Sequence, residues 1–144
     1  MSARILVVEP VRAVAKAIVA VLERRGHDVI AVGSAAEANQ HPGRFNCGVF
    51  SDELPDGNGI SLAGWLLAED RVDCVVFFGH AADVDTRLRA SNIGSFIQRD
   101  DGLYALSTAI DEAVMDTRER AQAVGAEGES EGRPELKSGK RRRR

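Results

Sequence analysis

The 144 residues give room for one compact domain and a tail, but not for two independent hydrophobic cores. Hydrophobic residues make up 44% of the chain and charged residues 28%, the balance of an ordinary globular protein. No apolar run approaches the roughly 20 residues of a membrane helix, and the start lacks the features of a signal peptide, so we expect a cytoplasmic protein with no membrane partner.

The net charge of −3 conceals two segments of opposite sign. Residues 1–124 contain 12 basic and 18 acidic residues, whereas residues 125–144 contain 7 basic and 4 acidic residues. The body of the chain is therefore acidic and its end basic. Cys47 and Cys74 lie in apolar runs without histidines at ligand spacing, so we expect buried free thiols and neither a disulfide framework nor a zinc site.

The start of the chain predicts a strand followed by a helix. Residues 4–8 read RILVV, a run too apolar to be half exposed, which is typical of a strand covered on both faces. Between residues 11 and 25, apolar residues recur at spacings of three and four. Gly26 follows, where a glycine that ends a helix belongs.

The same pattern repeats along the chain. Further strands are expected at residues 28–32, 47–51, 73–78 and 95–99, and further helices from Ser34 to Pro42, at 60–69, at 83–91 and from Leu103 onward. Ser34 with Glu37 three residues later has the form of a capping box. Strict alternation of five strands and five helices predicts an α/β fold, a doubly wound parallel sheet with helices on both faces.

The composition changes after Ala121. Gly, Glu, Ser and Pro dominate there, and the chain ends in KRRRR. Such a segment cannot bury enough apolar surface to offset the entropy lost on ordering, so we expect one folded domain at 1–121 and a disordered charged tail at 122–144. The basic run is a candidate contact for nucleic acid or another anionic partner, and a solvated tail is the alternative.

In a doubly wound sheet, ligands bind where the strands end. The segments around these ends read ILVVEP, SDELPDGNG, VVFFGH and SFIQRD. With these segments, the chain resembles a response-regulator receiver domain of two-component signalling. The resemblance covers residues 4 to about 120, and SDELPDGNG is the most specific match. The resemblance implies a flavodoxin-like five-stranded sheet of order 2-1-3-4-5. It also implies phosphoryl transfer from a histidine kinase to an aspartate, with Mg²⁺ held by three acidic positions.

At the first and third strands, the site positions of that family are altered. Glu9 keeps a carboxylate at the first acidic position, but Pro10 brings no ligand atom to the second. The acceptor position falls on Ser51, whose hydroxyl is a poor nucleophile without an adjacent base and would give an ester unlike the labile acyl phosphate.

At the fourth and fifth strands, further roles are lost. The hydroxyl position falls on Gly79, which offers only backbone groups. With a shortening of about two residues between Gly94 and Phe96, the lysine position falls on Arg99 and the switch aromatic on Phe96. An arginine keeps the positive charge but not the compact geometry of an ammonium group.

These changes predict no useful affinity for Mg²⁺, and no cofactor is expected. Glu9 and Arg99 could instead form an ion pair that fixes the loops. Asp52 is the one candidate for an alternative phosphoacceptor, in which case Mg²⁺ would be needed. Because side chains alternate along a strand, however, Asp52 should point away from the pocket that Ser51 faces.

The sequence therefore favours a degenerate, non-enzymatic receiver that acts by binding another signalling protein. The expected binding face consists of the fourth helix, fifth strand and fifth helix, which could also form a homodimer. Its residues are Asp83, Asp85, Arg87, Arg89 and Phe96, and their charge pattern would select partners. The alternatives are a working phosphoacceptor domain that uses Asp52, and a nucleic-acid-associated protein that acts through the basic tail.

Overall fold

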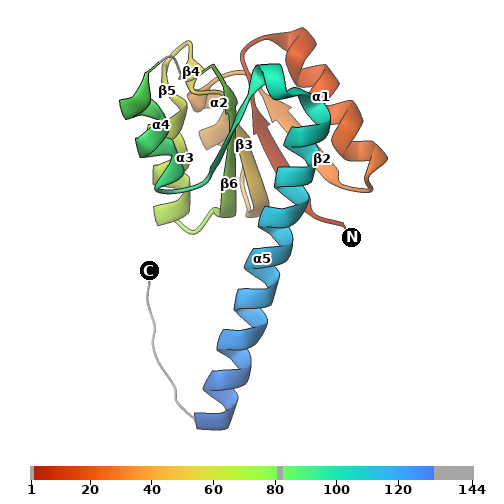
Figure 1. Ribbon diagram of the computed structural model, residues 1–144, viewed down its shortest axis with the longest axis vertical. Coiled ribbons are helices and arrows are strands. Elements are labelled where there is room, and N and C mark those ends of the chain that lie inside the picture. The colour runs from red at the N-terminus through yellow and green to blue at the C-terminus, as the bar shows by residue number, and fades with distance from the viewer. Residues whose placement is uncertain (1, 81–82, 132–144) are drawn as a thin grey trace.

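The computed structural model describes residues 2–80 and 83–131 (Figure 1). Its elements are, in chain order, β1 Arg4–Val8, α1 Arg12–Arg24, β2 Asp28–Val32, α2 Ala35–Gln40, β3 Phe45–Phe50, β4 Glu53–Leu54, β5 Gly57–Asn58, α3 Gly59–Ala68, β6 Val72–Gly79, α4 Val84–Ser91, β7 Ser95–Gln98, a short 3₁₀ helix Arg99–Asp101 and α5 Gly102–Glu131.

Five strands form one parallel sheet in the order β2-β1-β3-β6-β7. Counting only the strands of this sheet, the order is 2-1-3-4-5, so the predicted topology is confirmed. β4 and β5 form a separate antiparallel hairpin between β3 and α3, which the sequence analysis did not predict.

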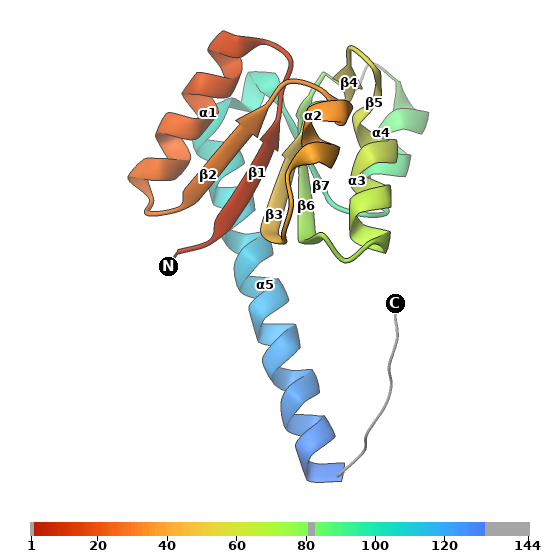
Figure 2. The same cartoon turned by 180° about the vertical axis from the view of Figure 1, so that it is seen from behind.

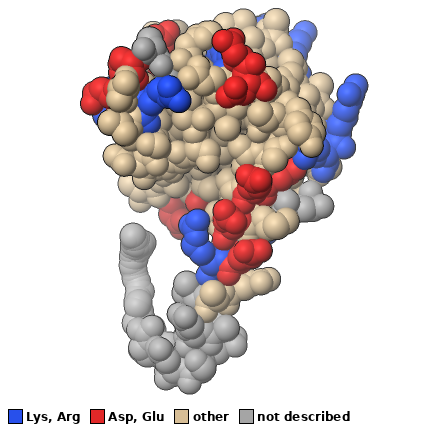
Figure 3. Space-filling model, in the orientation of Figure 1, with Lys and Arg blue, Asp and Glu red and all other residues tan. Residues whose placement is uncertain are grey.

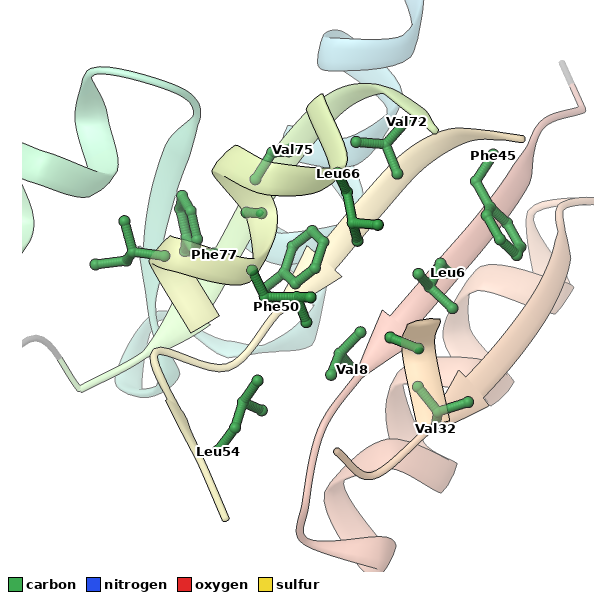
Figure 4. Packing of buried hydrophobic residues seen from close by; sticks show 14 of the residues in the cluster. Leu6, Val8, Val32, Phe45, Phe50, Leu54, Leu66, Val72, Val75 and Phe77 are labelled. Carbon is green, nitrogen blue, oxygen red and sulfur yellow. The ribbon is translucent and has the colours of Figure 1, made fainter. Parts of the chain in front are cut away.

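Helices cover both faces of the sheet (Figures 1 and 2). α1 and α5 pack on one face through a cluster that includes Ile18, Leu22, Leu106, Ile110 and Val114. α2, α3 and α4 lie over the other face, where Phe50, Leu66 and Phe77 form the centre of a second cluster (Figure 4). A sheet with a core on each side requires strands that are apolar throughout, which explains why β1 and β6 lack polar alternation.

Side-chain hydrogen bonds fix where α2 begins. The Ser34 hydroxyl accepts a hydrogen bond from the Glu37 amide at 3.2 Å, which is one half of the predicted capping box; the Glu37 carboxylate accepts from the Gly33 amide at 2.6 Å and not from that of Ser34. The Asp56 carboxylate also accepts hydrogen bonds from the Ala35 and Ala36 amides, at 2.9 and 3.0 Å. The hydrogen bond from Ala35 and, to a smaller extent, that from Ala36 lower the pKa of Asp56. The loop before α3 is thereby tied to the first turn of α2.

α5 continues through Glu131 and projects beyond the sheet (Figure 1). Residues 122–131, which the composition predicts to be disordered, are helical here. Alanine and glutamate, which favour helix, recur in this segment. The rest of the predicted tail, residues 132–144 with the KRRRR run, lies outside the described residues, and the division at residue 121 remains a prediction. No helix in the described part of the chain is both long enough and apolar enough to cross a membrane.

Candidate functional site

The carboxyl ends of the parallel strands bring three polar side chains to one place. Glu9 directly follows β1, Ser51 directly follows β3, and Arg99 directly follows β7. Although 90 residues separate Glu9 from Arg99 along the chain, their side chains are in contact. Sheet topology alone therefore assembles this candidate site.

The carboxylate of Glu9 is buried and both of its oxygens have hydrogen-bond donors. The residue is only 3% exposed. Its Oε1 accepts a hydrogen bond from Arg99 Nη2 at 2.6 Å, and its Oε2 accepts one from the Val11 amide at 2.9 Å. A carboxylate so deeply buried needs these partners because an uncompensated charge in the interior is costly.

Arg99 contacts the other two polar residues of the site, Glu9 and Ser51. Besides its ion pair with Glu9, its Nη2 donates a longer hydrogen bond to Ser51 Oγ at 3.4 Å. The guanidinium carbon lies 5.2 Å from the centroid of the Phe78 ring, in the range of a cation–π contact. The ion pair expected from the sequence is present, and a planar guanidinium can make all three contacts at once.

Ser51 uses its hydroxyl within its own loop. Its Oγ donates to the Glu53 carbonyl at 3.0 Å. The backbone of α3 approaches the same point so closely that a Cβ on Gly59 would lie 1.7 Å from the Ser51 carbonyl oxygen. The glycine of the SDELPDGNG segment is therefore required by close backbone contact beside Ser51.

Asp52 lies where the sequence did not place it. A Cβ built on Gly79 would meet the Asp52 Oδ1 at 2.1 Å, so the Asp52 carboxylate occupies the space of a side chain at position 79. The sequence did not predict this contact with Gly79, because the alternation of side chains placed Asp52 away from the pocket that Ser51 faces. The physical reason is that β3 ends at Phe50, so the alternation of a strand does not extend to residues 51 and 52.

Solved structures with the same architecture identify the fold. The receiver domain of Francisella response regulator 1452 superposes with a TM-score of 0.69 at 18% identity, covering 80% of this chain and 98% of that one. A CheY-like receiver domain from Methanospirillum hungatei gives a TM-score of 0.72 at 22% identity, with 83% and 99% covered. This chain has the receiver fold.

A larger protein with the receiver fold is also similar. NtrX from Brucella abortus, solved in complex with ADP, gives a TM-score of 0.75 at 19% identity, and the match covers 94% of this chain but 31% of that one. No protein-family model matches the sequence, and comparison with curated proteins finds no match. The likeness therefore lies in the fold, with low sequence identity.

The Mg²⁺ that the resemblance implies does not fit the residues at this edge of the receiver fold. Both oxygens of Glu9 already accept hydrogen bonds, and Pro10 offers no side-chain donor atom. The third position, Ser51, brings a neutral hydroxyl, whereas Mg²⁺ prefers several carboxylate or phosphate oxygens in octahedral geometry. Across residues 2–80 and 83–131, no three His, Cys, Asp or Glu side chains are grouped to hold a metal ion.

Phe96, which the resemblance to receivers assigns to the switch-aromatic position, is half-buried on β7. Its ring stacks on that of Phe77, with centroids 6.3 Å apart and planes 23° apart. Phe77 in turn contacts Phe50 at 6.2 Å. This inward orientation is therefore held by a row of aromatic side chains in the core.

The four charged residues predicted for a binding face all lie on or beside α4 and are exposed. Asp83 caps the helix by accepting from the Thr86 amide, which lowers its pKa, and Asp85 lies 3.6 Å from Arg89. Two apolar neighbours on the same helix, Val84 and Leu88, were not predicted as part of this face and are 72% and 59% exposed. Their i, i+4 spacing was the available signal, because the two residues lie on one side of the helix.

Proposed function

We propose that this chain is a degenerate receiver module that acts by binding another signalling protein and needs no phosphoryl group to do so. The observation that carries the proposal is the buried ion pair of Glu9 and Arg99. In it, Glu9, the one carboxylate kept among the three acidic positions that the resemblance implies, is neutralised by a cation from the chain itself. A site with this pairing has no unmet need for a divalent ion, and its loops have one stable arrangement. On this proposal the protein is not an enzyme and works in the cytoplasm.

The partner-binding face that we propose is α4 with β7 and the adjoining part of α5. Val84 and Leu88 supply exposed apolar area, and Asp83, Asp85, Arg87 and Arg89 surround them with charges of both signs. Apolar contact at the centre of an interface contributes affinity, whereas the charges favour one partner over another. A homodimer through the same face, and an anionic partner for the basic tail, remain further proposals.

A second candidate is a working phosphoacceptor domain that uses Asp52. It is favoured by one contact, the Asp52 carboxylate against Gly79, which brings an acidic group to a position of the site. It is opposed by the lack of a carboxylate at positions 10 and 51, because phosphoryl transfer in such sites depends on a bound cation that offsets the charge of the transferred group.

A phosphodonor assay separates the two candidates. We expect no gain of a phosphoryl group when the full chain is incubated with acetyl phosphate and Mg²⁺ and its intact mass is measured. The Asp52→Asn variant should likewise show no gain. A gain that hydroxylamine removes, and that Asp52→Asn abolishes, would establish the second candidate and refute the first.

Replacing Leu88 tests the proposed face. We expect Leu88→Glu to reduce capture of the partner by at least about tenfold, since a charge at the centre of an apolar contact must be desolvated without a counterion. Tyr104→Glu is the matched control, because Tyr104 is 77% exposed at the start of α5, on the side where its ring contacts Arg25, the residue that follows α1. Quantitative pull-down with each immobilised variant is the measurement, and selective loss in Tyr104→Glu would assign binding to the other face.

A further inference from the structure

The two cysteines of the chain are direct neighbours in the sheet. Cys47 on β3 pairs in register with Cys74 on β6, and both side chains belong to the cluster beneath α1 and α5. From the sequence, they were expected only to be buried free thiols. Cys47 is fully buried, but Cys74 is only partly buried. The pair therefore combines one thiol that solvent can reach with one that it cannot.

Their placement is compatible with a disulfide under strain. Neighbouring strands lie about 4.8 Å apart, which is within the Cα separation that a disulfide spans. A disulfide holds its two Cβ atoms at about 3.8 Å, however, so β3 and β6 would have to move together locally. Strain of this kind makes a disulfide easier to reduce. A bond between these two thiols would consequently be reversible.

Cys74 is reached from a groove at the amino-terminal ends of β6 and β7, the opposite edge from the candidate site. The groove has a volume of about 360 Å³, and its polar lining includes Asp73, Glu112, Asp116, Thr117 and Arg120. Acidic side chains gather along α5 where it leaves the domain (Figure 3). A small neutral reagent can enter such a groove more readily than an anionic one, because the acidic residues outnumber the single arginine.

The surroundings make the two thiols chemically different. A hydrogen bond from the Cys47 thiol lowers the pKa of Cys74, and Thr117 and Arg120 act in the same direction. The same hydrogen bond and complete burial raise the pKa of Cys47. In the thiol form, Cys74 Sγ donates to the Asn46 carbonyl at 3.3 Å, which holds the sulfur beside β3. Because a reagent in the groove reaches Cys74 and not Cys47, and the lowered pKa of Cys74 favours its thiolate, Cys74 is the nucleophile of the pair.

We propose that Cys74 and Cys47 form a reversible oxidation site for hydroperoxides, with Cys74 as the attacking and Cys47 as the resolving thiol. The Cys74 thiolate attacks one peroxide oxygen, a sulfur–oxygen bond forms, the oxygen–oxygen bond breaks, and hydroxide (or alkoxide) leaves. Cys47 sulfur then attacks the sulfenic acid, a disulfide forms, the sulfur–oxygen bond breaks, and the departing hydroxide takes the Cys47 proton as water. The two sulfurs together lose two electrons, and one peroxide is reduced.

This inference is independent of the proposed partner binding. The disulfide would join β3, which Ser51 directly follows, to β6, which ends in Gly79, so oxidation would act on the central scaffold of the sheet. A dithiol reductant would reverse it.

Oxidation of the full chain by hydrogen peroxide tests the proposal. After treatment of the reduced native chain with peroxide, neither thiol should react with an alkylating reagent, and the chain should be lighter by two hydrogen atoms. It should stay monomeric on a non-reducing gel, and dithiothreitol should restore both thiols. In Cys47→Ala, dimedone should label Cys74. In Cys74→Ser, Cys47 should oxidise at least about tenfold more slowly, because it is buried and mainly protonated.

A measurement without any substitution guards against a variant that fails to fold. In the native chain, we expect iodoacetamide to modify Cys74 at least about 100-fold faster than Cys47, since Cys47 reacts only when the sheet opens. The ratio of the Cys74 rate to the Cys47 rate should be smaller with anionic iodoacetate. The proposal is overturned if both thiols remain free after peroxide, if the only disulfide joins two chains, or if the two cysteines react with iodoacetamide at equal rates.

Discussion

Arg99→Ala will lower the free energy of unfolding by about 3 kcal/mol or more, since removing one partner of a buried ion pair leaves the other charge uncompensated. The Glu9 side chain is 2% exposed and that of Arg99 18%, so water cannot replace the lost cation without opening the site. Urea denaturation followed by far-ultraviolet circular dichroism gives the change, provided that the slope of the transition is unchanged.

Two further variants make that result specific. In Glu9→Gln/Arg99→Ala the buried charge is absent, so the double variant should be more stable than Arg99→Ala alone. Arg89→Ala is the matched control, because its pair with Asp85 is exposed, and we expect a loss of about 0.5 kcal/mol or less. Equal losses in Arg99→Ala and Arg89→Ala would show that the pair at the site is hydrated and has no structural role.

Phe77→Ala will cost about 3 to 5 kcal/mol, the usual range for truncating a buried aromatic side chain. Phe77 is fully buried and contacts both Phe50 and Phe96, so its loss leaves a cavity between β3, β6 and β7 and removes the support of the switch-aromatic position. The same denaturation experiment measures the loss of stability, and the near-ultraviolet spectrum reports whether the remaining aromatic rings stay ordered.

Leu88→Ala is the control for the core, because Leu88 is 59% exposed and alanine favours helix. We expect its stability to stay within about 0.5 kcal/mol of the native chain. If Phe77→Ala lost no more than Leu88→Ala, the aromatic row could not be what holds Phe96 inward. Comparing Phe77→Ala with Leu88→Ala therefore tests the packing of the aromatic row without changing any polar residue of the site.

Whether a residue of the candidate site could be predicted from the sequence depends on whether its position is set by local motif spacing or by contacts between distant segments. The identities of Pro10, Ser51 and Gly79 are legible without coordinates, because the segments that contain them are short and have recognisable spacing. The ion pair of Glu9 with Arg99 could also be anticipated once the strand order was assumed. Asp52 could not be placed in this way, because its direction depends on where β3 stops.

Some stabilising contacts had no signal in the sequence. His27 is buried, accepts a hydrogen bond from the Ala3 amide at Nδ1 and contacts Asp111 through Nε2 at 2.9 Å. It thereby links the end of α1 and the start of β1 to α5. Neither partner could be chosen from local pattern, because 84 residues separate His27 from Asp111.

The sequence by itself determined the α/β alternation, the order of the five strands through its resemblance to receivers, and the residues present at the strand ends. Periodicity and motif spacing act over a few residues, so they are readable along the chain. Only the tertiary structure decided that Asp52 lies against Gly79, that Asp56 caps α2, and that Cys47 faces Cys74. Each of these contacts depends on how separate strands and loops are brought into register, which is set by packing of the whole domain.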